Sequence, residues 1–83
     1  MFRLKIPAKA KRDLKRIKSR YQHAVAVALE DIKEDPMLGK PLERNLTGKY
    51  TYRVGVYRII YTINKKDKVI TLLSAGHRAT VYQ

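Results

Sequence analysis

The side chains in this sequence that are best suited to bind or act on a ligand are two arginines in the middle of the chain. Residues 50–61 read YTYRVGVYRIIY and predict a β-hairpin that reverses at Gly55-Val56, because a type II′ turn favours glycine at its first loop position. In that register Arg53 stands directly opposite Arg58, and like charges so placed destabilise a sheet. Two interpretations stay open from the pair alone: it binds an anion, or both side chains extend into solvent.

Further polar residues near the end of the chain are expected to join this pair. A buried strand is predicted over residues 69–75, ended by Gly76. A three-stranded antiparallel meander reverses direction twice, so its last strand finishes beside the hairpin turn. The expected cluster at that end, almost without carboxylates, consists of Lys49, Arg53, Arg58, His77, Arg78 and Tyr82.

Such a cluster suits the cleavage of RNA. The 2′-hydroxyl of RNA already lies beside the scissile phosphate, so the protein needs neither its own nucleophile nor a metal-activated water. Arginine binds phosphate oxygens bidentately, and crowded cations favour His77 or Lys49 as general base or acid. Tyr82 suits stacking on an unpaired base or donation of its phenol proton. The structural alternatives are a packing role for Tyr82 and a solvated loop position for Lys49.

Size and charge limit the classes of function. The 83 residues predict one domain, residues 1–83, with 19 Lys and Arg against 7 Asp and Glu, a net charge of +12 and no cysteine. This charge favours nucleic acid, an anionic membrane surface or an acidic protein as partner. We expect a cytoplasmic protein without a membrane partner, because the chain lacks a signal peptide and a membrane-spanning run. Metal-ligand clusters, nucleotide-binding glycine motifs and a hydrolase triad are also missing from the sequence.

The elements that position the cluster predict an α+β domain in the order β-α-α-β-β-β. Alternation places the tyrosines of the hairpin on its apolar face, which the helical hairpin is expected to cover in a mainly antiparallel four-stranded sheet. Ser19 is the predicted cap of the second helix, with one unbroken helix as the alternative. The expected elements are a strand over 2–6, helices from 8 that break near 18–20 and end at Asp35-Pro36, a loop over 36–49, the hairpin, and the strand 69–75.

The hairpin and the tail also carry a family resemblance. The chain reads LTGKY at 46–50, RVGVYRIIY at 53–61 and GHRATVY at 76–82. This combination resembles the RelE/ParE superfamily of toxins from toxin–antitoxin systems, and the likeness spans nearly the whole chain. Both branches of the superfamily share the hairpin motif. The tail is similar to RelE-type mRNA interferases, which cleave mRNA in the ribosomal A site, whereas ParE-type gyrase poisons typically lack it.

The resemblance implies a RelE-like microbial RNase fold and a ribosome-dependent, metal-independent endoribonuclease. Attack by the 2′-hydroxyl would leave a 2′,3′-cyclic phosphate and a 5′-hydroxyl. The arginines would hold and neutralise the phosphate, Tyr82 would orient the mRNA, and His77 or Lys49 would transfer protons. The implied catalytic residues are Arg53, Arg58, His77, Arg78 and Tyr82, and the expected RNA-binding residues are Lys40, Arg44 and Lys49.

One departure from the family pattern is Thr51, which stands where well-known members have a second basic residue; Lys49, on the same side of the strand, is the candidate to compensate. The resemblance also implies a RelB-like antitoxin, whose acidic and partly disordered segment wraps the basic surface in a toxin–antitoxin hetero-oligomer. Ribosome and mRNA are the other expected partners, and no cofactor is expected. Two other functions stay open: a ParE-like inhibitor of DNA gyrase, and an inactive basic module that binds RNA or an antitoxin.

Overall fold

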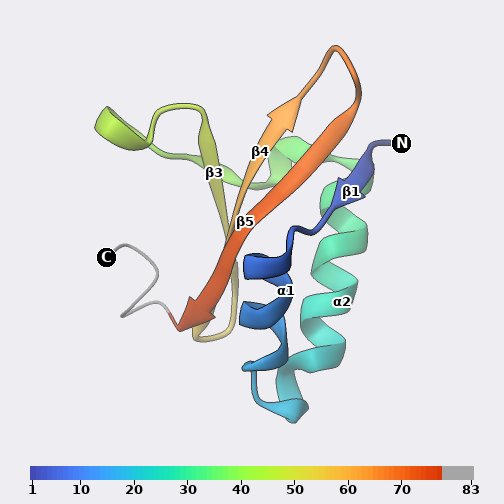
Figure 1. Cartoon of the computed structure of the whole chain (residues 1–83), viewed down its shortest axis with the longest axis vertical. Coiled ribbons are helices and arrows are strands. Elements are labelled where there is room, and N and C mark those ends of the chain that lie inside the picture. The colour runs from blue at the N-terminus through green and yellow to red at the C-terminus, as the bar shows by residue number, and fades with distance from the viewer. Residues whose placement is uncertain (78–83) are drawn as a thin grey trace.

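A computed structural model describes residues 1–77, apart from the side chain of Arg44. It shows a five-stranded sheet with both helices on one face (Figure 1). The strand order is β1-β5-β4-β3-β2, with β1 parallel to β5 and the other neighbours antiparallel. The elements are β1 (Arg3–Lys5), α1 (Ala8–Lys15), α2 (Ser19–Glu34), η1 (Pro36–Leu38), β2 (Lys40–Pro41), η2 (Arg44–Leu46), β3 (Lys49–Val54), β4 (Tyr57–Asn64) and β5 (Val69–His77).

The predicted break between the two helices is confirmed, but its cap is not Ser19. Ser19 is the first residue of α2, Lys18 occupies the capping position, and no side chain caps this end. The break is stabilised from the other side, because the Gln22 amide donates to the carbonyl oxygens of Leu14 at 2.9 Å and Ile17 at 2.7 Å. Carbonyls near the end of a helix have spare accepting capacity, so Gln22 of α2 links its own helix to the last turn of α1 and to the connection that follows it. Neither helix has the length and apolar content to cross a bilayer.

The sheet has five strands rather than the predicted four, because a two-residue strand lies within the segment 36–49 that was expected to be loop. Lys40 pairs with Thr51 and Pro41 with Tyr50. Two residues are too few to show an alternating pattern, and proline is tolerated at a sheet edge. The preceding segment is held by the Tyr61 hydroxyl, which donates to the Pro36 carbonyl at 2.7 Å. A Cβ at Gly39 would collide with that same hydroxyl.

The core lies between the helices and the tyrosine-rich face of the hairpin, as predicted. Tyr57, Ile59 and Tyr61 of this face are each less than 9% exposed, and they pack with residues of α2 and β5. Burying one such side chain contributes about 1.5–3 kcal/mol relative to leaving it in water. The buried partners on α2 and β5 are Val25, Ala28, Leu29, Ile32, Ile70, Leu72 and Ala75.

Strand β5 is longer than predicted and ends at His77, two residues beyond the expected stop at Ala75. Gly76 does not break the strand, because it continues the ladder opposite Arg58. A register shift between Ile60 and Tyr61 leaves Leu73 as an extra residue in β5. Such a bulge increases the local twist of a strand and re-aims the residues that follow it. The end of β5 therefore meets the hairpin turn, as the meander predicted.

Candidate nucleic-acid interface

The hairpin register is the one predicted from the sequence. Val54 pairs with Tyr57, and Arg53 pairs with Arg58. Gly55 has a φ of 60°, whereas Val56 does not have a positive φ. Positive φ at the first loop residue alone matches a type II′ turn, whose twist suits the strands that flank it. The turn therefore fixes the like-charged pair at the end of the hairpin.

Both arginines lie on the sheet face that points away from the helices, which we call the open face. Their neighbours Tyr52 and Ile59 point to the core, and side chains alternate across a strand. Arg53 is exposed and Arg58 is half-buried. Two arginines paired across neighbouring strands on one face offer forked donors of the kind that bind a phosphate.

The row next to the arginines supplies another cation on the open face. Lys40 of β2 is the cross-strand neighbour of Thr51, and paired residues share a face. Thr51 is only 8% exposed, whereas Lys40 is exposed. Lys49 lies one row further from the turn, opposite Thr62. The fold thus brings two of the expected RNA-binding residues to the face of the arginine pair, and Lys40 is the direct neighbour of Thr51.

Carboxylates are segregated from this surface. None of the described ladder positions on the open face holds Asp or Glu. The described residues likewise contain no group of three side chains suited to hold a metal ion. Most acidic residues lie at the far end of α2 or just beyond it, namely Glu30, Asp31, Glu34 and Asp35. The open face therefore presents cations and hydroxyls to an anionic ligand.

His77 reaches the hairpin end but lies on the other side of the sheet from Arg58. Its register partner is Tyr57, whose side chain faces the helices, and the two rings are 6.3 Å apart. Tyr57 in turn meets Tyr21 edge-on at 5.2 Å and accepts a hydrogen bond from the Lys18 backbone at 3.3 Å. The exposed imidazole thus sits at the rim where β5 ends.

Three of the expected site residues have no described side-chain position. Arg78 and Tyr82 lie outside residues 1–77, and the side chain of Arg44 is also outside the described part, although its backbone begins η2. Their roles stay predictions. The described geometry therefore rests on Arg53, Arg58, Lys40 and Lys49.

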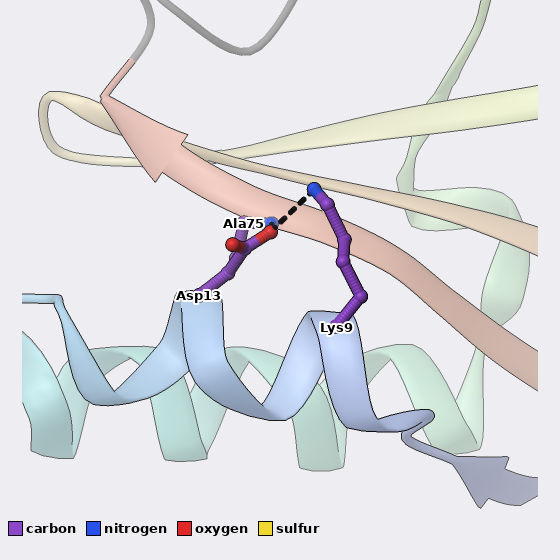
Figure 2. Close-up of polar contacts among 3 residues, drawn as sticks. All are labelled: Lys9, Asp13 and Ala75. Carbon is purple, nitrogen blue, oxygen red and sulfur yellow. Dashed lines mark hydrogen bonds and ion pairs between the residues drawn. The ribbon is translucent and has the colours of Figure 1, made fainter.

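One residue of this end was missed by sequence reasoning. Asp13 of α1 is 15% exposed, and its Oδ2 lies 2.8 Å from the Lys9 ammonium while it accepts a hydrogen bond from the Ala75 backbone at 3.2 Å (Figure 2). A pocket of about 560 Å³ opens beside it, lined also by Arg16 and His77. The only signal in the sequence was a lone acid within the basic helix AKAKRDLK.

With this geometry established, comparison with known proteins identifies the family. A family model for the ParE toxin of the type II toxin–antitoxin system parDE matches residues 4–82. Toxin RelG of Mycobacterium tuberculosis is 33% identical over 84 residues, covering 99% of this chain and 97% of the relative. The chain belongs to the RelE/ParE superfamily of type II toxins.

Solved structures of other members match the fold of this RelE/ParE toxin. The toxin–antitoxin complex RelBE2 of M. tuberculosis contains a chain with 33% identity and a TM-score of 0.84, covering 93% of this chain and 98% of that one. The isolated E. coli RelE toxin superimposes with a TM-score of 0.80 at 20% identity, covering 99% and 92%. The latter likeness supports the architecture of two helices on a mixed sheet.

Proposed function

We propose that this toxin is a ribosome-dependent, metal-independent endoribonuclease that cleaves mRNA in the A site. The observation that supports it most is the Arg53–Arg58 pair on the open face, at the end where β5 finishes. The similarity to RelG and to a second M. tuberculosis relative, Toxin RelE, favours the RelE branch; the latter is 30% identical over 84 residues.

In the proposed reaction the 2′-oxygen of the nucleotide before the scissile bond attacks its phosphorus. The 2′-hydroxyl loses its proton, the bond to the 5′-oxygen breaks, and that oxygen takes a proton as it leaves. Arg53 and Arg58 hold the phosphate and neutralise the charge that grows on the phosphorane. Arg78 is proposed to join them and Tyr82 to orient the mRNA. Protons would be transferred by Lys49, on the same face, or by His77, whose exposed ring lies on the helix side at the end of β5. Lys40, Arg44 and Lys49 bind the flanking phosphates.

The proposed partner in the cell is a RelB-like antitoxin that binds the basic surface through an acidic segment. A net charge of +12 favours association with an acidic partner. Relatives have been solved as toxin–antitoxin complexes. One of them is the RelBE2 complex of M. tuberculosis, which contains a chain 33% identical to this one. We propose that the two proteins form a hetero-oligomer in the cytoplasm, where the ribosome and mRNA also lie.

Inhibition of DNA gyrase is the second candidate function. The family model that matches residues 4–82 is named for the ParE toxin. A gyrase inhibitor has no need of a phosphate site built from Arg53, Arg58 and Arg78. Substitutions of these arginines therefore separate the two functions.

The test measures cleavage on programmed ribosomes by primer extension, alongside gyrase supercoiling. We expect cleavage in the A-site codon, little cleavage of naked RNA, and a loss of about a hundredfold to a thousandfold for Arg78→Ala. Lys66→Ala, which removes a cation from the β4–β5 turn far from the hairpin end, is the matched control and should cleave normally. Supercoiling inhibition without cleavage would favour the gyrase function, and neither activity would leave a binding module.

A further inference from the structure

Near the end of β5, the outer edge of the strand is bordered by a helix rather than by another strand. β1 pairs only with Val69–Thr71, so the rest of β5 has strand β4 on one side and α1 on the other (Figure 1). Backbone N–H groups on such an edge need partners, because an unsatisfied donor away from water is costly. The Ala75 N–H finds its partner in the Asp13 carboxylate, 62 residues earlier in the chain.

Asp13 is held as a fixed acceptor rather than a mobile surface acid. Its helix is anchored through Ala10, which is fully buried, and through Gln22, which bonds the carbonyls at the end of α1. Lys9, one turn earlier, approaches the same carboxylate oxygen and orients it (Figure 2). Hydrogen bonds to a charged acceptor are stronger than neutral ones, so this contact restrains the strand more than an ordinary edge contact.

The bond to Ala75 acts on residues that belong to the proposed site. Ala75 is followed directly by Gly76, the register partner of Arg58, and by His77, whose ring meets Tyr57. Beyond Thr71 the strand β1 gives this end no support. Small displacements of the groups around a reacting phosphate slow the reaction: a misplacement of about 1 Å can lower the rate on the order of a hundredfold.

The charge of Asp13 makes a role in anion binding implausible. A carboxylate next to the pocket that Lys9, Arg16 and His77 line lowers the positive potential that would attract RNA. We infer that Asp13 is a positioning residue: its carboxylate on the Ala75 N–H fixes the end of β5 against the Arg53–Arg58 pair. This inference rests on the proposed nuclease function.

The test compares Asp13→Ala with Asp13→Asn, two variants of equal net charge that differ in the side-chain oxygen able to accept the Ala75 N–H. We expect Asp13→Ala to lose about tenfold to a hundredfold in single-turnover cleavage on programmed ribosomes, with ribosome affinity little changed. Asp13→Asn should retain most of the rate. Hydrogen exchange of the Ala75 amide should accelerate in Asp13→Ala and stay slow in Asp13→Asn. Lys11→Ala, an exposed position on the same helix, is the control and should match the unaltered toxin.

A second variant covers the case in which Asp13→Ala fails to fold. Asp13→Glu keeps the charge and the acceptor but moves the carboxylate by one methylene, so it should fold and still cleave more slowly. Equal rates for Asp13→Ala, Asp13→Asn and Asp13→Glu, or a loss of thermal stability alone, would overturn the positioning role. Absence of cleavage by the unaltered toxin would instead refute the proposed nuclease, while the exchange of the Ala75 amide would still report on the bond.

Discussion

On the helix-covered face of the β3–β4 hairpin, Tyr52 stands opposite Ile59; one residue along each strand, Arg53 stands opposite Arg58 on the open face. The first pair packs into the core, and aromatic–aliphatic pairs stabilise a sheet. The second pair sets two positive charges side by side, which costs stability. The same backbone therefore supports folding on one face and places like charges together on the other. We therefore expect the ligand to bind at the Arg53–Arg58 pair, which lowers the stability of the sheet.

Removing the charged pair should separate activity from stability most sharply. The double variant Arg53→Ala/Arg58→Ala should lose more than the hundredfold to thousandfold that one donor to a transition-state oxyanion typically costs, about 3–4 kcal/mol in activation free energy. Its melting temperature should stay the same or rise, since the repulsion is gone. Single-turnover cleavage and thermal unfolding measure the two effects. Unfolding of this variant would mean that the arginines support the fold.

The neighbouring residue on the covered face should behave in the opposite way. Ile59 is fully buried, so Ile59→Ala removes apolar burial and leaves a cavity, at a cost of about 2–5 kcal/mol in the free energy of unfolding. Cleavage per folded molecule should change little, because the open face keeps its charges. Urea denaturation gives the first quantity, and the rate normalised to the folded fraction gives the second. A lower cleavage rate of Ile59→Ala under conditions in which the variant is fully folded would show that the two faces are coupled.

Tyr61 offers a test of the covered face by pH. Burial raises the pKa of its phenol from 10.0 to about 12, and a hydrogen bond with the Gly39 backbone only partly opposes this. The folded state therefore holds the proton more tightly than the unfolded state. This contribution to stability is complete below about pH 10 and is lost as the pH rises toward about 12.

Tyr61→Phe should accordingly cost about 1–2 kcal/mol near neutral pH, because the buried Pro36 carbonyl loses its donor. Above about pH 10 the variant should lose stability less steeply than the unaltered toxin. Lysines titrate in the same range in both proteins, so the difference between the two pH profiles isolates Tyr61. Parallel profiles would show that the phenol does not keep its proton through burial.

The smallest expected effect comes from reversing one charge on the open face. Arg53→Glu turns a like-charged cross-strand pair into an opposite one, which should stabilise the toxin by about 0.2–1 kcal/mol. Binding to RNA should weaken at the same time, because a carboxylate now faces the phosphate. Thermal unfolding and RNA binding across a salt series detect both changes. Destabilisation by this substitution would remove the basis for treating the pair as a cost.

The sequence predicted those parts of the fold whose signals are local. A glycine at the turn, alternating tyrosines and an Asp-Pro at a helix end are patterns of a few residues, and the hairpin register, the covered face and the end of α2 followed from them. The two-residue strand β2 has no such pattern, because the segment before it, Pro36 to Gly39, packs against Tyr61, which lies far along the chain. Gly76 looked like a strand end because pairing with Arg58 cannot be seen locally.

For the candidate site the division is similar. Arg53 and Arg58 followed from one turn, whereas the position of Lys40 opposite Thr51 depends on strand β2, which no local pattern predicts. The bond from Ala75 to Asp13 joins residues 62 positions apart, and no spacing in the sequence predicts such a contact. His77 reached the expected end but on the helix side, because strand parity after the bulge decides its face. Arg78 and Tyr82 remain predictions from the resemblance.

The most direct test of the central claim replaces the 2′-hydroxyl of the mRNA itself. The claim is that a face of cations without carboxylates cleaves RNA by using this hydroxyl as the nucleophile. An mRNA with a 2′-deoxy nucleotide immediately before the scissile phosphate, placed in the A site of programmed ribosomes, should bind the toxin normally and resist cleavage at that bond. The all-ribose mRNA should be cut there to a 2′,3′-cyclic phosphate and a 5′-hydroxyl. Cleavage of the deoxy-substituted bond at the normal rate would contradict the account.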